Sequence, residues 1–540
     1  MKSLIKLQQY RKCIMMFVIG IVCTTLAFIV HMVDPVKRIM EHEVKMTPNS
    51  YTFALWKKPP IDVLINVYVF NITNAEVFLS GAEKLKLKEV GPYVYQEILE
   101  NTNVTWNENG TLSYIPRRTV IFRRDLSAGD PNQDYVSVPN LPLLGVSSAL
   151  KNAGFLVNFP FVQLANYLDS QPILHITAQN YFWGYDDSLV RLASTVVPSY
   201  IHFSKFGLLD RMYDEGANVF NMISEPNGDL VTETGRYLSV DSINGNPGME
   251  QWGYISEAHN KTNPANRKCN MLRGVYEGTV FPTHMDKRAQ FRIYRKAFCR
   301  PLPINFVKET TKFGLSGYEY TLPDNFADRP DTNPDNECYC RHGECMKKGL
   351  LDMTPCYFNI PAAASLPHFL NGDPSLSNGI EGLKPDPEKH RTEIILQPDI
   401  GIPIYVRSRM QTNLVMGETR YNAKIKHFNN MTVPLFWTDV VIPGLPDDIL
   451  FLMKFSINVA PIIQQIIVIL LAIIGLALIC WSLVRVVVIV QEEQEEAIVA
   501  SKERRDSNDP RVPLGYGQYT AIHILPAIKK MSSKVDLFSS

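Results

Sequence analysis

The sequence lacks the common signatures of catalysis. It contains no G-x-S-x-G, H-E-x-x-H or G-x-G-x-x-G string and no P-loop, so nothing points to a hydrolase, a zinc protease, a dinucleotide-binding enzyme or an NTPase. It also lacks an excess of either charge, because 54 Lys and Arg balance 54 Asp and Glu. Without a basic surface there is no reason to expect nucleic acid as a partner. We therefore predict a protein that is not an enzyme, with no catalytic residue, cofactor or metal.

Two long apolar runs, residues 13–33 and 459–490, stand out in the chain. Each holds about 20 apolar residues, which as a helix match a hydrocarbon core about 30 Å thick. The first run is longer than the core of a signal peptide and no small-x-small site follows it, which favours an uncleaved anchor. Lys and Arg beyond the outer ends of both runs favour cytosolic termini. The predicted order is a cytosolic N-terminus (1–12), a span (13–33), an ectodomain (34–458), a span (459–490) and a cytosolic tail (491–540).

The N-x-[ST] sequons test this topology independently. All five lie between the two apolar runs and none lies outside them. Oligosaccharyl transfer occurs on the lumenal side, so this distribution indicates an extracellular or lumenal ectodomain. The predicted glycosylation sites are Asn71, Asn103, Asn109, Asn260 and Asn430.

Cysteine is scarce, and six of the nine cysteines lie within residues 269–356. In an oxidising compartment an even set predicts disulfides, with 15 possible pairings. Zinc is the rival interpretation, because Cys338, Cys340 and His342 belong to a dense group of ligand types. Zinc sites usually place two to four residues between paired cysteines, whereas a single residue separates Cys338 from Cys340. Disulfides are therefore favoured, with the pairing left open. The six are Cys269, Cys299, Cys338, Cys340, Cys345 and Cys356.

The region between the spans is predicted to be mainly β with inserted helices (α+β). Its 61–70 segment is rich in β-branched and aromatic residues and predicts a strand buried on both faces. Residues 141–197 instead carry apolar patterns of helical length, which predict a small helical cluster. Further strands are expected at residues 118–123, 290–294, 392–396 and 402–416, and short helices at 35–46 and 447–455.

Ten short strings follow one another in the ectodomain. They begin at Tyr68 (YVFNITN), Glu89 (EVGPYVY), Trp183 (WGYDD), Phe206 (FGLL), Cys299 (CR), Cys338 (CYC), Leu366 (LPHF), Glu381 (EGL), His390 (HRT) and Pro434 (PLFW). This series resembles the class B scavenger receptor family, of the fatty acid translocase, lipoprotein receptor and lysosomal integral membrane protein type, and the chain looks like an insect-like member of it. The resemblance covers residues from about 10 to 490 and includes both spans. Within it, Gly91-Pro92 predicts a tight turn between strands, and Trp183 and Trp437 are expected to pack in the core.

The resemblance implies a β-barrel-like core crossed by an apolar tunnel, with a helical tip at about 141–197. It also implies the pairs Cys269–Cys338, Cys299–Cys356 and Cys340–Cys345. The implied function is a receptor in the plasma membrane that binds lipids, lipoproteins, carotenoids or sterols and passes them through the tunnel to the bilayer. A lysosomal or endosomal location is the alternative. Two alternative functions stay open: a trafficking or phagocytic receptor for a protein or cell-surface partner, and a sensory co-receptor for a hydrophobic odorant. The oligomeric state is not predicted.

Two departures refine these expectations. Some relatives carry lysines on the tip, but residues 166–177 contain no Lys or Arg here, which favours neutral over anionic ligands. His175 in this stretch is interpreted as a surface histidine with no role, in preference to a pH sensor. In the tail, Tyr519 and Ile522 fit the tyrosine-x-x-bulky pattern that clathrin adaptors bind as an extended strand.

Overall fold

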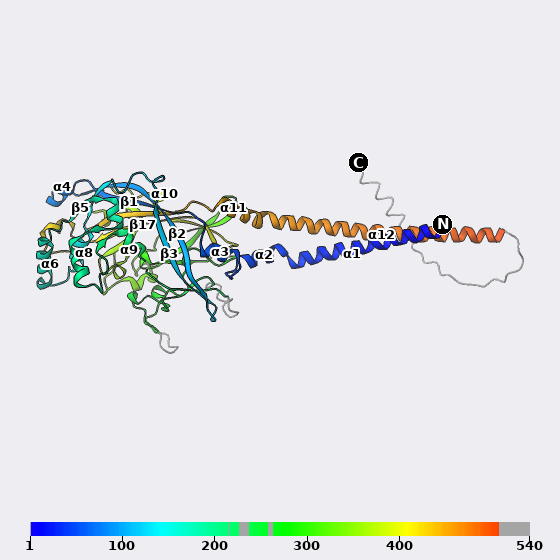
Figure 1. The fold of residues 1–540 in the computed structure, drawn as a ribbon, viewed down its shortest axis with the longest axis horizontal. Helices are drawn as coiled ribbons and strands as arrows, with labels where there is room; N and C mark the ends of the chain where they lie inside the picture. The colour runs from blue at the N-terminus through cyan, green and yellow to red at the C-terminus, as the bar shows by residue number, and fades with distance from the viewer. Residues whose placement is uncertain (1, 215, 226–236, 257–262, 507–540) are drawn as a thin grey trace. The chain divides into compact units, whose positions relative to one another are not determined.

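The computed structural model describes residues 2–214, 216–225, 237–256 and 263–506 (Figure 1). They form two compact units, which are described separately. The membrane unit comprises residues up to 34 and from 463 onward, and the ectodomain comprises residues 35–462.

The membrane unit consists of two long helices, α1 (Lys2–Val33) and α12 (Ala460–Asp506). Both are long and apolar enough to cross a bilayer, and they carry the predicted spans. The backbones of the two helices come close together at two glycines, Gly20 and Gly475. A Cβ on Gly20 would lie 2.8 Å from the Gly475 carbonyl oxygen, and one on Gly475 would lie 2.9 Å from that of Gly20. Small residues at a helix crossing bring backbones together in this way and maximise van der Waals contact within lipid.

The ectodomain is built on one large sheet with the strand order β10-β11-β12-β16-β17-β18-β1-β2-β3-β8-β9 (Figure 1). Neighbours along this path are antiparallel. Small pairs β4–β5 and β6–β7 lie apart, β13 and β14 extend from β17, and β15 joins β2 in parallel. The bounds are β1 (Val63–Ile72), β2 (Leu85–Trp106), β3 (Thr111–Phe122), β4 (Tyr135–Pro139), β5 (Ile173–Thr177), β6 (Tyr185–Asp186), β7 (Lys205–Phe206), β8 (Phe220–Ile223), β9 (Val240–Ile243), β10 (Phe291–Arg295), β11 (Arg300–Lys312), β12 (Leu315–Thr321), β13 (Leu351–Asp352), β14 (Ala362–Ser365), β15 (Ile380–Glu381), β16 (Glu393–Gln397), β17 (Ile402–Val415) and β18 (Thr432–Ile442).

A two-residue segment closes this sheet into a barrel. Val275 forms an antiparallel bridge with Val240 of β9, and Tyr276 forms a parallel bridge with Ile293 of β10. The two ends of the strand path are thereby joined, and no open edge remains at that place. The predicted β-barrel-like α+β core is confirmed.

Strand β1 shows why this sequence forms a barrel wall. Ile65, Val67 and Val69 point to one side and are fully buried, as the period of two requires. On the other side Tyr68 is half-buried and stacks on Trp437 of β18, with ring centroids 4.1 Å apart. The strand thus packs against side chains on both faces, with Tyr68 only partly covered.

The prediction of a turn at Gly91-Pro92 is wrong. Both residues lie inside β2, which continues from Leu85 to Trp106. The register with β1 shifts there, because Val67 pairs with Tyr93 and Val69 pairs with Val90. The Gly-Pro pair is accommodated as a bulge, where proline needs no ladder hydrogen bond.

Several helices of the ectodomain lie at its two ends, whereas α9 and α10 lie between these ends (Figure 1). Helices α6 and α8 lie at one end and α3 and α11 at the other (Figure 1), so the predicted cluster at 141–197 occupies one end of the barrel. Asp187 begins α8 by accepting hydrogen bonds from the backbone N–H groups of Leu189 and Val190. The bounds are α2 (Pro35–Glu43), α3 (Tyr51–Lys57), α4 (Ala75–Ser80), α5 (Leu141–Ala149), α6 (Phe155–Tyr167), α7 (Ala178–Trp183), α8 (Ser188–Val196), α9 (Leu208–Tyr213), α10 (Pro387–His390) and α11 (Asp447–Lys454).

Three disulfides hold the region between β9 and β14. They are Cys269–Cys338, Cys299–Cys356 and Cys340–Cys345, with Cα–Cα distances of 5.9, 5.8 and 4.3 Å. These are the pairs that the resemblance implied. Because all six thiols are paired, none of them is left as a zinc ligand.

Candidate binding cavity

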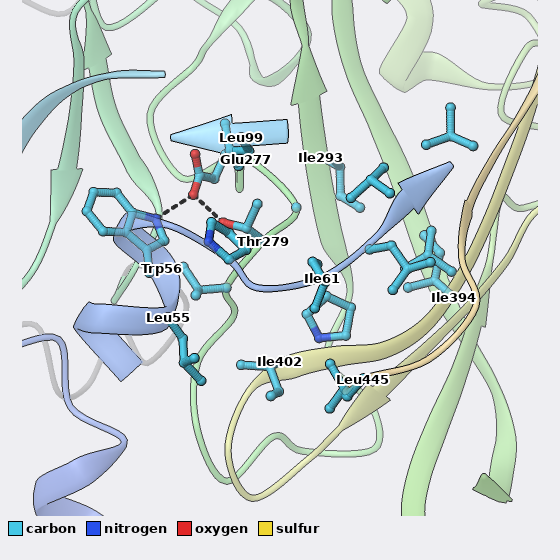
Figure 2. Close-up of a pocket in the computed structure, with 18 of the residues that line it drawn as sticks. Leu55, Trp56, Ile61, Leu99, Glu277, Thr279, Ile293, Ile394, Ile402 and Leu445 are labelled. Carbon is cyan, nitrogen blue, oxygen red and sulfur yellow. Dashed lines mark hydrogen bonds between the residues drawn. The ribbon is translucent and has the colours of Figure 1, made fainter. Parts of the chain in front are cut away.

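A cavity of about 550 Å³ lies inside the barrel (Figure 2). Its walls come from strands β1, β2, β3, β10, β11, β16, β17 and β18 and from α2, α3, α9 and α11. Most of the lining is aliphatic, and the volume falls in the range of sites that enclose small ligands. The aliphatic residues labelled in Figure 2 are Leu55, Ile61, Leu99, Ile293, Ile394, Ile402 and Leu445.

The cavity does not extend into the helical cluster at 141–197. None of its lining residues belongs to α5, α6, α7 or α8. In this conformation the described cavity therefore occupies the α3 and α11 end of the barrel and is not continuous with the opposite end.

Glu277 forms one polar position in this apolar wall. Its side chain is buried, with 6% of the residue exposed. The Trp56 indole N–H donates to Oε1 over 2.7 Å, and the Tyr114 hydroxyl donates to Oε2 over 2.6 Å. The Thr279 hydroxyl also donates to Oε1. A buried carboxylate is costly unless it is hydrogen-bonded, and three neutral donors supply those bonds.

Local structure places these donors. Ser50 begins α3 by accepting from the Phe53 N–H over 3.1 Å, and the Asn101 amide of β2 donates to the Trp56 carbonyl over 2.8 Å. Trp56 is thereby held edge-on against Tyr114, with ring centroids 4.7 Å apart. On the other side, Glu277 directly follows the segment that closes the barrel.

A second polar position lies further along β3. Glu97 and Arg118 form a buried ion pair, and Arg295 Nη2 lies 3.8 Å from Glu97 Oε1. Burial by itself would raise the pKa of Glu97, but attraction to Arg118 and Arg295 holds it below its ordinary value. Burial together with the Glu97 charge raises the pKa of Tyr213, which also lines the cavity.

Four of the recognised strings meet in a different buried cluster. His368 Nε2 lies 2.8 Å from Glu89 Oε2, and the Trp437 indole donates to the same oxygen over 2.8 Å. The His390 ring stacks on His368 with centroids 4.6 Å apart. Burial by itself would raise the pKa of Glu89, but the bonds from His368 and Trp437 lower it. None of these four residues lines the cavity, so the cluster supports the fold.

His390 gives this cluster a pH dependence. Its Nδ1 accepts from the Asp386 N–H over 2.9 Å, and burial, followed by the nearby His368, lowers its pKa to about 4. The unfolded chain takes up the proton near pH 6.5 and the folded chain does not. The stability linked to His390 is therefore complete above about pH 6.5 and is lost as the pH falls toward about 4.

When the pH falls from 7 to 5, the free energy of unfolding of the wild type decreases. We expect this decrease to be smaller by about 1–2 kcal/mol in the His390→Gln variant, which lacks the titrating imidazole. Thermal unfolding of the purified chain at both pH values measures this difference. The exposed His202→Gln variant is the control and should behave as the wild type. A pH dependence in His390→Gln equal to that of the wild type would contradict the assignment.

The structure describes some of the other predicted positions and not others. Asn103, Asn109 and Asn430 are exposed, whereas Asn71 is half-buried and its side-chain oxygen accepts from the Ser137 N–H over 2.7 Å; glycosylation at all of them stays a prediction. Asn260, Tyr519 and Ile522 lie outside the described residues. Within the described part of the chain, no group of three or more His, Cys, Asp or Glu is arranged to hold a metal ion.

Comparison with known proteins identifies the chain. The model of the CD36 family matches residues 13–486. The chain is 28% identical to scavenger receptor class B member 1 of Bos taurus, over 78% of each protein. It is 29% identical to lysosome membrane protein 2 of Homo sapiens, over 74% of this chain and 79% of the relative. It is 26% identical to protein peste of Drosophila melanogaster, over 75% and 70% respectively.

These relatives fit a two-span membrane protein whose termini are both cytosolic. They include a cell-surface scavenger receptor and a lysosomal membrane protein, which are the two predicted locations. The match over nearly the whole length establishes that the chain belongs to the CD36 family, whose members are receptors.

Proposed function

We propose that this receptor binds a hydrophobic ligand in the barrel cavity and passes it to the membrane. The observation that carries the proposal is the cavity itself, a largely aliphatic space of about 550 Å³ enclosed by the barrel. Each CH₂ removed from water is worth about 0.8 kcal/mol, so a lipid gains strongly by entering such a space. The lining also includes α2 and α11, the ectodomain helices that adjoin the spans in the sequence.

The apolar surface of α6 supports a capture step outside the cavity. Leu156 and Tyr167 are 86% and 87% exposed, and Phe155, Val157 and Phe159 are also exposed. The helix carries no charged residue. Exposed apolar surface of this kind marks an interaction site, and its lack of charge suits the neutral surface of a lipid-bearing particle.

A bulky side chain inside the cavity tests the transfer step. We expect Thr438→Trp or Ile402→Trp to reduce uptake of a labelled carotenoid or sterol by cells at least about tenfold, because the indole occupies the ligand space. The matched control is Thr119→Trp, which places the same side chain on the exposed face of β3. Surface levels of each variant are measured in parallel.

Unchanged uptake in both cavity variants would overturn the transfer mechanism. Retained binding of particles together with unchanged uptake would instead favour the second candidate, a binding or trafficking receptor that uses the exposed α6 surface for its partner.

A further inference from the structure

Glu277 is not needed to hold hydrocarbon. A carboxylate in the wall of an apolar cavity lowers the affinity for alkyl chains, because part of the wall then prefers a polar partner. The chain nevertheless supplies Trp56, Tyr114 and Thr279 to keep this carboxylate in place. Three donors that hold the Glu277 carboxylate in the wall of the cavity fit a residue that recognises the polar part of a ligand.

The hydrogen bonds leave one acceptor position open on Glu277. An ionised carboxylate offers about four acceptor positions, two on each oxygen. Among the described residues, Trp56 and Thr279 donate to Oε1, whereas Tyr114 is the one donor to Oε2. A ligand that donates one hydrogen bond completes the set, and a ligand without a donor leaves it incomplete.

The charges of the lining favour a neutral ligand. Among the charged residues that line the cavity, Glu43 has a side chain that is 44% exposed, so water screens it. The others are the carboxylates Glu97 and Glu277 and the guanidinium groups Arg118 and Arg295, which balance. A neutral head group keeps this balance, whereas an acid or an amine adds an uncompensated charge in a place of low dielectric constant.

The two polar positions are separated along one strand. Tyr114 and Arg118 lie four residues apart on the same face of β3, which corresponds to about 13 Å. Glu277 is bonded to the first and Glu97 to the second. A head group bonded to Glu277 is therefore remote from the guanidinium groups, and its hydrocarbon lies along the aliphatic wall between them.

We propose that Glu277 Oε2 accepts a hydrogen bond from the hydroxyl group of a lipid alcohol, so that the cavity selects neutral, hydroxyl-bearing lipids over their ethers, acids and amines. This inference rests on the proposed function and names the ligand class of the same cavity.

Equilibrium binding to the full-length chain in lipid nanodiscs tests the proposal. The probes are 1-hexadecanol, hexadecyl methyl ether, hexadecanoic acid and hexadecylamine, which share one chain and differ at the head group. Binding to the cavity is the part that the Thr438→Trp variant loses. The alcohol should bind about tenfold more tightly than the ether, because a hydrogen bond to a charged acceptor is among the stronger ones.

Two variants locate this selectivity. Glu277→Gln should reduce the preference for the alcohol over the ether to within about threefold, because a neutral amide is a weaker acceptor. Glu43→Gln, which changes an exposed carboxylate of the same lining, should keep the full preference. Thermal unfolding of both variants checks that they are folded.

Equal binding of the alcohol and the ether by the wild type overturns the inference, as does a preference for the acid or the amine. A folded Glu277→Gln variant that keeps the full preference also overturns it. If no probe binds in the cavity, the proposed function itself is wrong, and this result is distinct from the loss of head-group selectivity alone.

Discussion

Replacing Cys299 and Cys356 together with alanine is expected to remove about 4 kcal/mol of stability and to abolish delivery of the receptor to the cell surface. The bond closes a loop of 57 residues, and a loop of this length loses much of its entropy in the unfolded chain when it is cross-linked. Because domains are stable by only about 5–15 kcal/mol, this loss is a large fraction of the total. Surface biotinylation and thermal unfolding measure the two effects.

The same disulfide also organises its surroundings. Cys299 is fully buried, and its carbonyl accepts from the Trp252 indole over 2.6 Å. The matched control is the pair Cys340–Cys345, which is separated by only five positions and should cost about 2 kcal/mol when it is replaced by alanine. Equal losses for the two pairs would contradict the dependence on loop length.

The second large effect concerns the buried ion pair of the cavity wall. We expect Arg118→Met to destabilise the ectodomain by about 3–5 kcal/mol, because the buried Glu97 carboxylate then loses its closest cation and keeps Arg295 at 3.8 Å. Glu97 is 2% exposed, so water does not replace the lost partner. The free energy of unfolding from denaturant titration measures the change.

The double variant Glu97→Met with Arg118→Met separates the charge effect from the loss of packing. It should recover most of the loss, because an apolar pair leaves no uncompensated charge at this position. A double variant as unstable as the sum of the two single variants would show that the two side chains act independently. That outcome would contradict the interaction.

The sequence predicted those elements whose pattern is local. Helix α8 lies within the helical cluster predicted at 141–197, because Asp187 caps an apolar repeat of helical period. Both spans follow from composition alone. Most of β2 was not predicted, because a Gly-Pro pair such as Gly91-Pro92 usually marks a turn. The pairing with β1 shows that the strand instead continues through this pair as a bulge.

The cavity residues could not have been predicted in the same way. Trp56 and Glu277 are 221 positions apart and neither belongs to a motif. They meet because the barrel closes between them, so their contact depends on the register of many strands. Glu89, His368, His390 and Trp437 each stood in a recognised string, yet their assembly into one buried cluster also required the fold.

The segment that closes the barrel is paired with its neighbouring strands over only a short length. Strands β1 and β2 are joined by a ladder that runs from Val63 to Ile72, whereas among the described residues the link between β9 and β10 is the short segment 274–276. Separating the strands at this segment breaks few backbone hydrogen bonds, as it does at the three-pair ladder between β12 and β16, whereas separating β1 from β2 breaks a long ladder. Widening the barrel therefore costs least where the strand pairing is short, and one such place directly precedes Glu277 in the chain.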